Sequence, residues 1–219
     1  TSNDATIAIE INPKNQFAYI NRGYAYGETD QIELSIIDYS KAIELDENFS
    51  LPYLNRGVGN SKLGDYTKSI NDFNTAIELD SSDPIYFFNR GNSYLSLGDY
   101  ESAIEDYNNS IELDKYNATF YVNRGNVYLS LGDYEKAIED ENMAINLDDK
   151  LDSAYATRGI CYRELNELDK AIDDFDTALR LNPNSDVYFS SRGSAYLNAK
   201  KYEKAINDFN KSININPNN

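Results

Sequence analysis

The chain has 219 residues, with 20 Lys plus Arg against 37 Asp plus Glu, which gives a formal net charge of −17 at pH 7. Such an acidic chain repels phosphate backbones and anionic lipid surfaces, so we expect no nucleic-acid partner and no membrane partner. It has no His and a single Cys, Cys161, which excludes His-dependent catalytic triads, His-containing zinc sites and an internal disulfide.

One unit recurs along the whole chain. Arg-Gly dipeptides stand at a constant spacing of 34 residues, at Arg22-Gly23, Arg56-Gly57, Arg90-Gly91, Arg124-Gly125, Arg158-Gly159 and Arg192-Gly193. If each unit starts six residues before the Arg, the full units are 16–49, 50–83, 84–117, 118–151, 152–185 and 186–219. Residues 1–15 match the end of a unit, because Ala8, Ile9, Ile11 and Pro13 correspond to Ala178, Leu179, Leu181 and Pro183. We therefore predict one repeat domain over residues 1–219, which opens with the second helix of a truncated repeat.

The apolar periodicity predicts two short helices in each unit. In unit 118–151, Tyr121, Gly125 and Tyr128 share one face of a first helix. The segment Leu131-Gly132-Asp133 ends that helix, because Gly adopts the left-handed conformation past a helix end and Asp caps the helix that follows. The stripe of the second helix consists of Tyr134, Ala137, Ile138, Ala144 and Ile145. Neither helix can bury its stripe alone, so neighbouring units are expected to stack.

This pattern resembles the tetratricopeptide repeat, which has an aromatic, a Gly and a Tyr on its first helix and Ala, an aromatic, Ala and Pro on its second. The resemblance covers the whole chain and implies an all-α, right-handed superhelical solenoid of antiparallel helix pairs, with about 13 helices and with the first helices lining a concave face. Among the departures from the pattern, Asn60 replaces the usual Tyr, and Glu141 replaces the Tyr or Phe of the other units. Weaker local packing is expected at both.

An Asp follows each repeated Arg by 16 residues. A first-helix Arg and a second-helix Asp could face each other and form charge-assisted hydrogen bonds, and a partly buried Arg usually needs a carboxylate partner. We therefore predict structural pairs rather than ligand-binding arginines: Arg22–Asp38, Arg56–Asp72, Arg90–Asp106, Arg124–Asp140, Arg158–Asp174 and Arg192–Asp208.

A row of asparagines suggests a binding surface. The residues two places before each Gly are Asn21, Asn55, Asn89, Asn123, Thr157 and Ser191. In tetratricopeptide superhelices such residues commonly point into the groove, and this row resembles the asparagine ladder of peptide-binding members. An Asn amide both donates and accepts, so a ladder can bind the backbone of an extended peptide. Asn92 and Asn126 lie one turn further on. The alternative is that an Asn-rich chain carries Asn on a solvated face by composition alone.

Apolar side chains are expected around this ladder, as candidates for side-chain pockets: Phe17, Ile20, Tyr24, Leu54, Phe88 and Val122. The alternative for some of them is packing between adjacent first helices.

These observations predict a non-enzymatic interaction module whose groove binds an extended segment of a protein partner, with no catalytic residue, no cofactor and no metal. Two alternatives remain open. One is a structural spacer or assembly element that uses its ends or its acidic convex face, to which a basic partner would be attracted. The other is the targeting arm of a larger protein. Apolar ends predict weak end-to-end self-association. A cytoplasmic location is expected, and any targeting signal outside these residues is left open.

Overall fold

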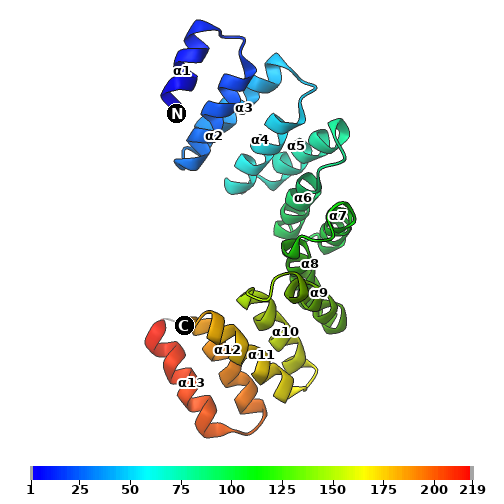
Figure 1. Ribbon diagram of the computed structural model, residues 1–219, viewed down its shortest axis with the longest axis vertical. Coiled ribbons are helices and arrows are strands. Elements are labelled where there is room, and N and C mark those ends of the chain that lie inside the picture. The colour runs from blue at the N-terminus through cyan, green and yellow to red at the C-terminus, as the bar shows by residue number, and fades with distance from the viewer. Residues whose placement is uncertain (1, 218–219) are drawn as a thin grey trace. The chain divides into compact units, whose positions relative to one another are not determined.

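The computed structural model describes residues 2–217, and every regular element among them is an α-helix (Figure 1). Helices follow one another in pairs, so the predicted all-α solenoid of repeated helix pairs is confirmed. The chain divides into two compact units, Thr1–Asp114 and Lys115–Asn219, and each is described by itself. The single domain over residues 1–219 stays a prediction.

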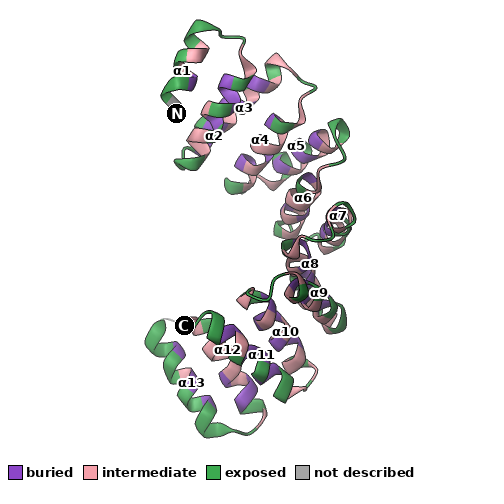
Figure 2. Ribbon diagram, in the orientation of Figure 1, coloured by how far each residue is buried: buried purple, intermediate pink, exposed green. Residues whose placement is uncertain are grey.

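The helices of both units begin and end near the predicted repeat boundaries. Unit 1 contains α1 (Ser2–Ile11), α2 (Gln16–Glu28), α3 (Ile32–Leu45), α4 (Ser50–Lys62), α5 (Tyr66–Leu79), α6 (Pro84–Ser96) and α7 (Tyr100–Leu113). Unit 2 contains α8 (Ala118–Leu131), α9 (Tyr134–Leu147), α10 (Asp152–Glu164), α11 (Leu168–Leu181), α12 (Asp186–Asn198) and α13 (Tyr202–Ile215). Within each unit, a first helix packs most extensively on the second helix that follows it. The buried residues lie along these contacts (Figure 2).

The close approach of paired helices depends on the repeated glycine. A Cβ atom added to Gly57 in α4 would lie 2.7 Å from Cε1 of Phe73, a fully buried side chain of α5. Since real Cβ atoms do not approach so closely, only glycine lets the aromatic ring lie directly on the first helix. The same arrangement joins Gly91 to Tyr107 in the next pair.

The turn within each pair uses the predicted Gly-Asp chemistry in three repeats. Gly132 lies in the left-handed region with φ 75° at the end of α8, and the Asp133 side chain accepts a hydrogen bond from the Lys136 backbone N–H at the start of α9. Gly64 and Gly98 occupy the corresponding turns. The other three repeats place non-glycine residues in the left-handed region, namely Asp30, Asn166 and Lys200.

Replacing Lys200 with glycine is expected to stabilise the chain by about 1 kcal/mol, because the left-handed conformation brings the Cβ of an L-residue close to a carbonyl oxygen. Its φ of 59° is a conformation that glycine adopts without this cost. Urea unfolding of the Lys200→Gly chain measures the change. Asn166→Gly is the matched control and should gain less, because Asn tolerates this region better. An unchanged or lower midpoint for Lys200→Gly would contradict the prediction.

Candidate functional site

The six predicted Arg–Asp pairs are brought together in the structure. Each Arg donates hydrogen bonds from Nε and Nη2 to the Asp carboxylate of its own second helix, with the shortest contact of each pair between 2.6 and 2.7 Å. The Asp side chains are almost completely buried, as in Asp106 at 2% exposure. Hydrogen bonds to Asp106 raise the pKa of Arg90 above its usual value. These arginines therefore join the first helix of each pair to the second.

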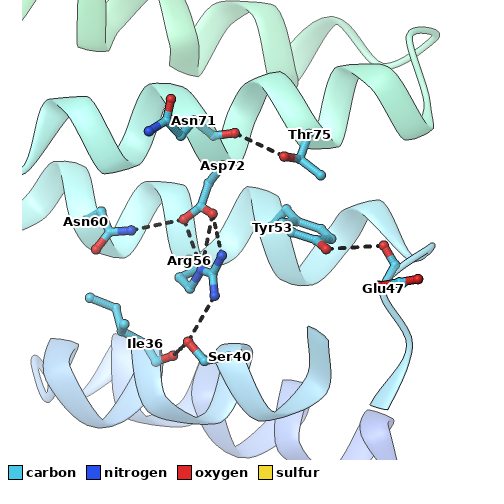
Figure 3. A network of polar contacts seen from close by, with 9 residues as sticks. All are labelled: Ile36, Ser40, Glu47, Tyr53, Arg56, Asn60, Asn71, Asp72 and Thr75. Atoms are coloured by element: carbon cyan, nitrogen blue, oxygen red, sulfur yellow. Dashed lines mark hydrogen bonds and ion pairs between the residues drawn. The ribbon is translucent and has the colours of Figure 1, made fainter. Parts of the chain in front are cut away.

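Some of the arginines have a second partner, which was not predicted. Nη1 of Arg56 donates to Oγ of Ser40 on the preceding second helix, at 3.1 Å, while Asn60 donates to Asp72 from the same helix as Arg56 (Figure 3). Asn60 thus replaces the usual Tyr with a satisfied polar contact. Three other arginines reach the residue 16 places earlier in the same way, in the pairs Arg90–Asn74, Arg158–Asn142 and Arg192–Asp176. The sequence does contain an indication of these partners, because the position 16 residues before each repeated Arg carries a small polar residue.

Four of the predicted groove residues line two neighbouring hollows in unit 1. A hollow of about 570 Å³ between α1 and α2 is lined by Asn21, Phe17 and Tyr24 among others, and the two aromatic side chains are each 60% exposed. One repeat further on, Asn55 and Tyr24 help to line a smaller hollow of about 100 Å³. Exposed aromatic rings beside amide side chains offer both apolar and hydrogen-bonding contacts.

The amides of the ladder differ in how far they are occupied. Asn21 is exposed and Asn55 is half-buried. Asn89 and Asn123 are also half-buried, and each donates a 2.8 Å hydrogen bond to a carbonyl of its own helix. An amide group has two N–H donors and an acceptor oxygen. Each of these two side chains therefore has one N–H and its oxygen left for a further hydrogen bond.

Asn92 and Asn126, one turn further on, bind other side chains of the repeats. Tyr107 donates to Asn92 at 2.7 Å, and Thr157 donates to Asn126 at 3.2 Å. The Asn92 oxygen therefore joins α6 to α7, and the Asn126 oxygen joins α8 to α10.

Ile20 is a correction to the expected pockets. Its side chain is only 6% exposed and packs in a cluster with Tyr19 and Tyr39, so it belongs to the core of unit 1. Leu54, Phe88 and Val122 are half-buried, and Phe88 lies with its ring centroid 5.9 Å from that of Tyr107.

Glu141 is the most unusual polar residue of unit 2. It is fully buried at the position of the aromatic residue, and neither carboxylate oxygen accepts a hydrogen bond among the described residues. Oε1 lies 2.6 Å from where a Cβ of Gly125 would stand. Burial, and then the charge of Asp140, raise the pKa of Glu141 to about 9, against the opposing effect of Arg158. Burial and the nearby Glu141 also raise the pKa of the Cys161 thiol to about 12, so this thiol stays protonated and unreactive at neutral pH.

Residues 2–217 contain neither a membrane-spanning helix nor a cluster of metal ligands. No helix in this range is both long and apolar enough to cross a membrane. Nor does any group of three or more Cys, Asp or Glu side chains in this range have the arrangement of a metal site.

Family models match most of the chain. Models described as tetratricopeptide repeat match residues 18–49, 118–150, 153–185 and 187–219, and one described as TPR repeat matches residues 61–98 and 91–132. A search of curated proteins found no match.

Solved structures share the fold at low sequence identity. YrrB, described as a TPR protein with an unusual peptide-binding site, is 24% identical with a TM-score of 0.69, over 82% of this chain and 93% of that chain. PilF of Pseudomonas aeruginosa is 16% identical with a TM-score of 0.81, over 93% of each chain. MamA of Desulfovibrio magneticus is 19% identical with a TM-score of 0.72, over 77% of this chain and 95% of that chain. All three have the architecture described above.

Proposed function

Because the chain belongs to the tetratricopeptide repeat family, we propose that it is a protein-interaction scaffold whose first helices bind an extended segment of a partner. The observation that carries this proposal is the hollow between α1 and α2, where Phe17 and Tyr24 are exposed beside Asn21. Large exposed apolar rings on a soluble surface are typical of a binding site. No step of this function needs a catalytic group.

The backbone of the partner is proposed to bind the asparagine ladder. Asn21 and Asn55 line successive hollows in unit 1, and Asn89 follows at the same spacing of 34 residues. Asn123 continues this spacing in unit 2, and Asn92 and Asn126 would contribute the amide donors that their present contacts leave. Leu54, Phe88 and Val122 would border the ladder as partly exposed apolar surface.

The charge of the hollow favours a basic segment. Asp4 and Glu28 both line it, beside the two exposed aromatic rings. Carboxylates attract Lys and Arg, and aromatic faces also bind cations. The end-to-end self-association predicted from the sequence stays a prediction.

Changing the four ladder asparagines to alanine is expected to weaken binding of an extended peptide about 100-fold, because each lost hydrogen bond contributes about 0.5–1.5 kcal/mol. A peptide library is screened against the native chain, and the selected peptides are titrated into the variant Asn21→Ala, Asn55→Ala, Asn89→Ala and Asn123→Ala.

The matched control changes four exposed asparagines outside the ladder, namely Asn12, Asn71, Asn207 and Asn210. Circular dichroism establishes that both variants are folded. Equal affinities for the ladder and control variants would reject the groove and favour the spacer alternative.

A further inference from the structure

Most of the repeated arginines lie between two aromatic rings of their own first helix. The rings belong to the residues three places before and four places after the Arg, one turn to either side along the helix. Cζ of Arg158 lies 5.5 Å from the ring centroid of Tyr155 and 6.0 Å from that of Tyr162. The same contacts recur in Tyr19–Arg22–Tyr26, Tyr121–Arg124–Tyr128 and Phe189–Arg192–Tyr196. Cation–π attraction therefore supports these arginines from two sides.

The second helix pair of unit 1 lacks the second of these rings. Cζ of Arg56 lies 5.7 Å from the ring centroid of Tyr53, but the residue four places after Arg56 is Asn60. The Asn60 side chain turns toward Asp72 and donates a 3.0 Å hydrogen bond to it (Figure 3). The other five complete repeats have a tyrosine at this position, namely Tyr26, Tyr94, Tyr128, Tyr162 and Tyr196. Repeat 50–83 therefore supplies no tyrosine of its own beside its arginine.

A hollow of about 480 Å³ lies beside Arg56, between the second helices α3 and α5. Its lining consists of Ile36 and Ser40 from α3, Arg56 and Asn60 from α4, and Lys68, Asn71 and Asp72 from α5. In the corresponding hollow of unit 2, Tyr196 forms part of the lining and packs in one cluster with Ile172. The counterpart of Ile172 in unit 1 is Ile36, which lines its hollow directly. Since a cavity of about 150 Å³ is enough to hold benzene, this hollow has room for an aromatic ring.

The hydrogen bonds of Arg56 favour a ring over an anion as the occupant. Nε and Nη2 donate to Asp72, and Nη1 donates to Ser40, so every nitrogen of the guanidinium group already has an acceptor (Figure 3). An anion would compete with these acceptors for the N–H groups. Cation–π attraction uses the charge of the guanidinium group and leaves its hydrogen bonds in place.

A lysine of the second helix lies over the tyrosine ring in three repeats. The distances from Nζ to the ring centroid are 5.3 Å for Lys136 and Tyr128, 5.0 Å for Lys170 and Tyr162, and 5.4 Å for Lys204 and Tyr196. Lys136 makes this contact while it also pairs with Asp133. Its counterpart Lys68 pairs with Asp65 in the same way and lines the hollow. A ring in the hollow would therefore lie beside two cations, Arg56 and Lys68.

We propose that this hollow binds a tyrosine side chain of a protein partner, placed beside Arg56 where the other repeats place their own tyrosine. A tyrosine fits better than a phenylalanine, because Lys68 and Asn71 offer hydrogen-bonding groups for the phenol hydroxyl. The lining residues all lie outside the asparagine ladder, so this site is separate from the proposed groove.

The probe is p-cresol, which reproduces the tyrosine side chain. The matched ligand is 4-methylcyclohexanol, which has the same carbon skeleton and hydroxyl group without an aromatic face. In an NMR titration of the full chain, p-cresol should shift the Arg56 Nε–H and Ile36 methyl signals upfield, with a dissociation constant in the millimolar range. It should bind at least about 5-fold more tightly than 4-methylcyclohexanol, because only the aromatic ring attracts the two cations.

Three chain variants test the location. Asn60→Tyr supplies the ring from the chain itself and should abolish the shifts, with circular dichroism as the check that the variant is folded. Lys68→Met should weaken p-cresol binding about 3-fold through loss of one cation. Lys136→Met is its matched control and should leave binding beside Arg56 unchanged, because Lys136 lies over a tyrosine that is already present.

Several outcomes would overturn the proposal. They are equal affinities for the two ligands, no shift at Arg56 or Ile36 up to the solubility limit of p-cresol, and unchanged binding in folded Asn60→Tyr. Loss of these shifts in the ladder variant would also overturn it, because p-cresol would then bind in the groove.

Discussion

Replacing Glu141 with phenylalanine is expected to raise the free energy of unfolding by at least about 3 kcal/mol at pH 7. The reason is that a carboxyl group without hydrogen-bond partners occupies the place where Phe73, Tyr107 and Phe175 fill their repeats. Phenylalanine at this position would pack on Gly125 as Phe73 packs on Gly57. Urea unfolding at pH 7 measures the gain.

The pH dependence of this effect separates ionisation from packing. The folded chain holds the Glu141 proton up to a pKa of about 9, while the ordinary value for the unfolded chain is 4.5. Folding therefore takes up a proton between these two pH values, and the free energy of unfolding falls as pH rises through the window. At pH 7 the accumulated loss is on the order of 3 kcal/mol.

Glu141→Gln is the matched control, because the amide keeps the shape of the protonated carboxyl group and cannot ionise. The free energy of unfolding of this variant should exceed that of the native chain by close to zero near pH 4.5. The difference should grow with pH to about 3 kcal/mol at pH 7. An advantage that is the same at pH 5 and pH 8 would show that Glu141 is not held protonated in the folded chain.

Replacing Arg90 with alanine is expected to destabilise the chain by about 3–5 kcal/mol, because it leaves a buried carboxylate without its partner. Asp106 is 2% exposed and receives hydrogen bonds from Nε and Nη2 of Arg90, at 2.8 and 2.6 Å. Arg90→Lys should also destabilise the chain, since an ammonium group cannot form the bidentate hydrogen bonds of the guanidinium group. Urea unfolding of the variants provides the measurement.

Two controls show whether the buried charge causes this loss. Asn74→Ala removes only the third contact of Arg90 and should cost about 1 kcal/mol. The double variant Arg90→Met, Asp106→Leu removes both charges and should recover most of the stability, because well-packed apolar residues can replace a buried ion pair. A loss in Arg90→Ala no greater than that in Asn74→Ala would contradict a structural role of the pair.

The helix pairs and the Arg–Asp contacts could be predicted because the chain repeats without insertions. The constant offset of 16 residues between Arg22 and Asp38 is kept in every later repeat, so sequence spacing reports a spatial pairing. For four of the six arginines, a second partner was missed because Ser40, Asn74 and Asp176 share a position and not a residue type.

The sequence did not show which residues of a first helix are exposed and which are buried. Ile20 and Phe17 are one helical turn apart, yet Ile20 enters the core and Phe17 stays exposed. Which of them is exposed depends on the rotation of α2 against α1 and α3, and a repeat pattern does not specify that rotation. The departure at Glu141 was visible in the sequence, but its protonation follows from burial, which only the packed structure shows.

The arginine contacts give the repeat array a direction. Arg56 donates to Ser40 of the preceding repeat, and Arg90, Arg158 and Arg192 likewise reach back to the repeat before their own. Removing repeat 186–219 would leave Arg158 with both Asp174 and Asn142, while removing repeat 16–49 would take Ser40 from Arg56. Gain and loss of repeats during evolution should thus be tolerated better at the C-terminal end than at the N-terminal end.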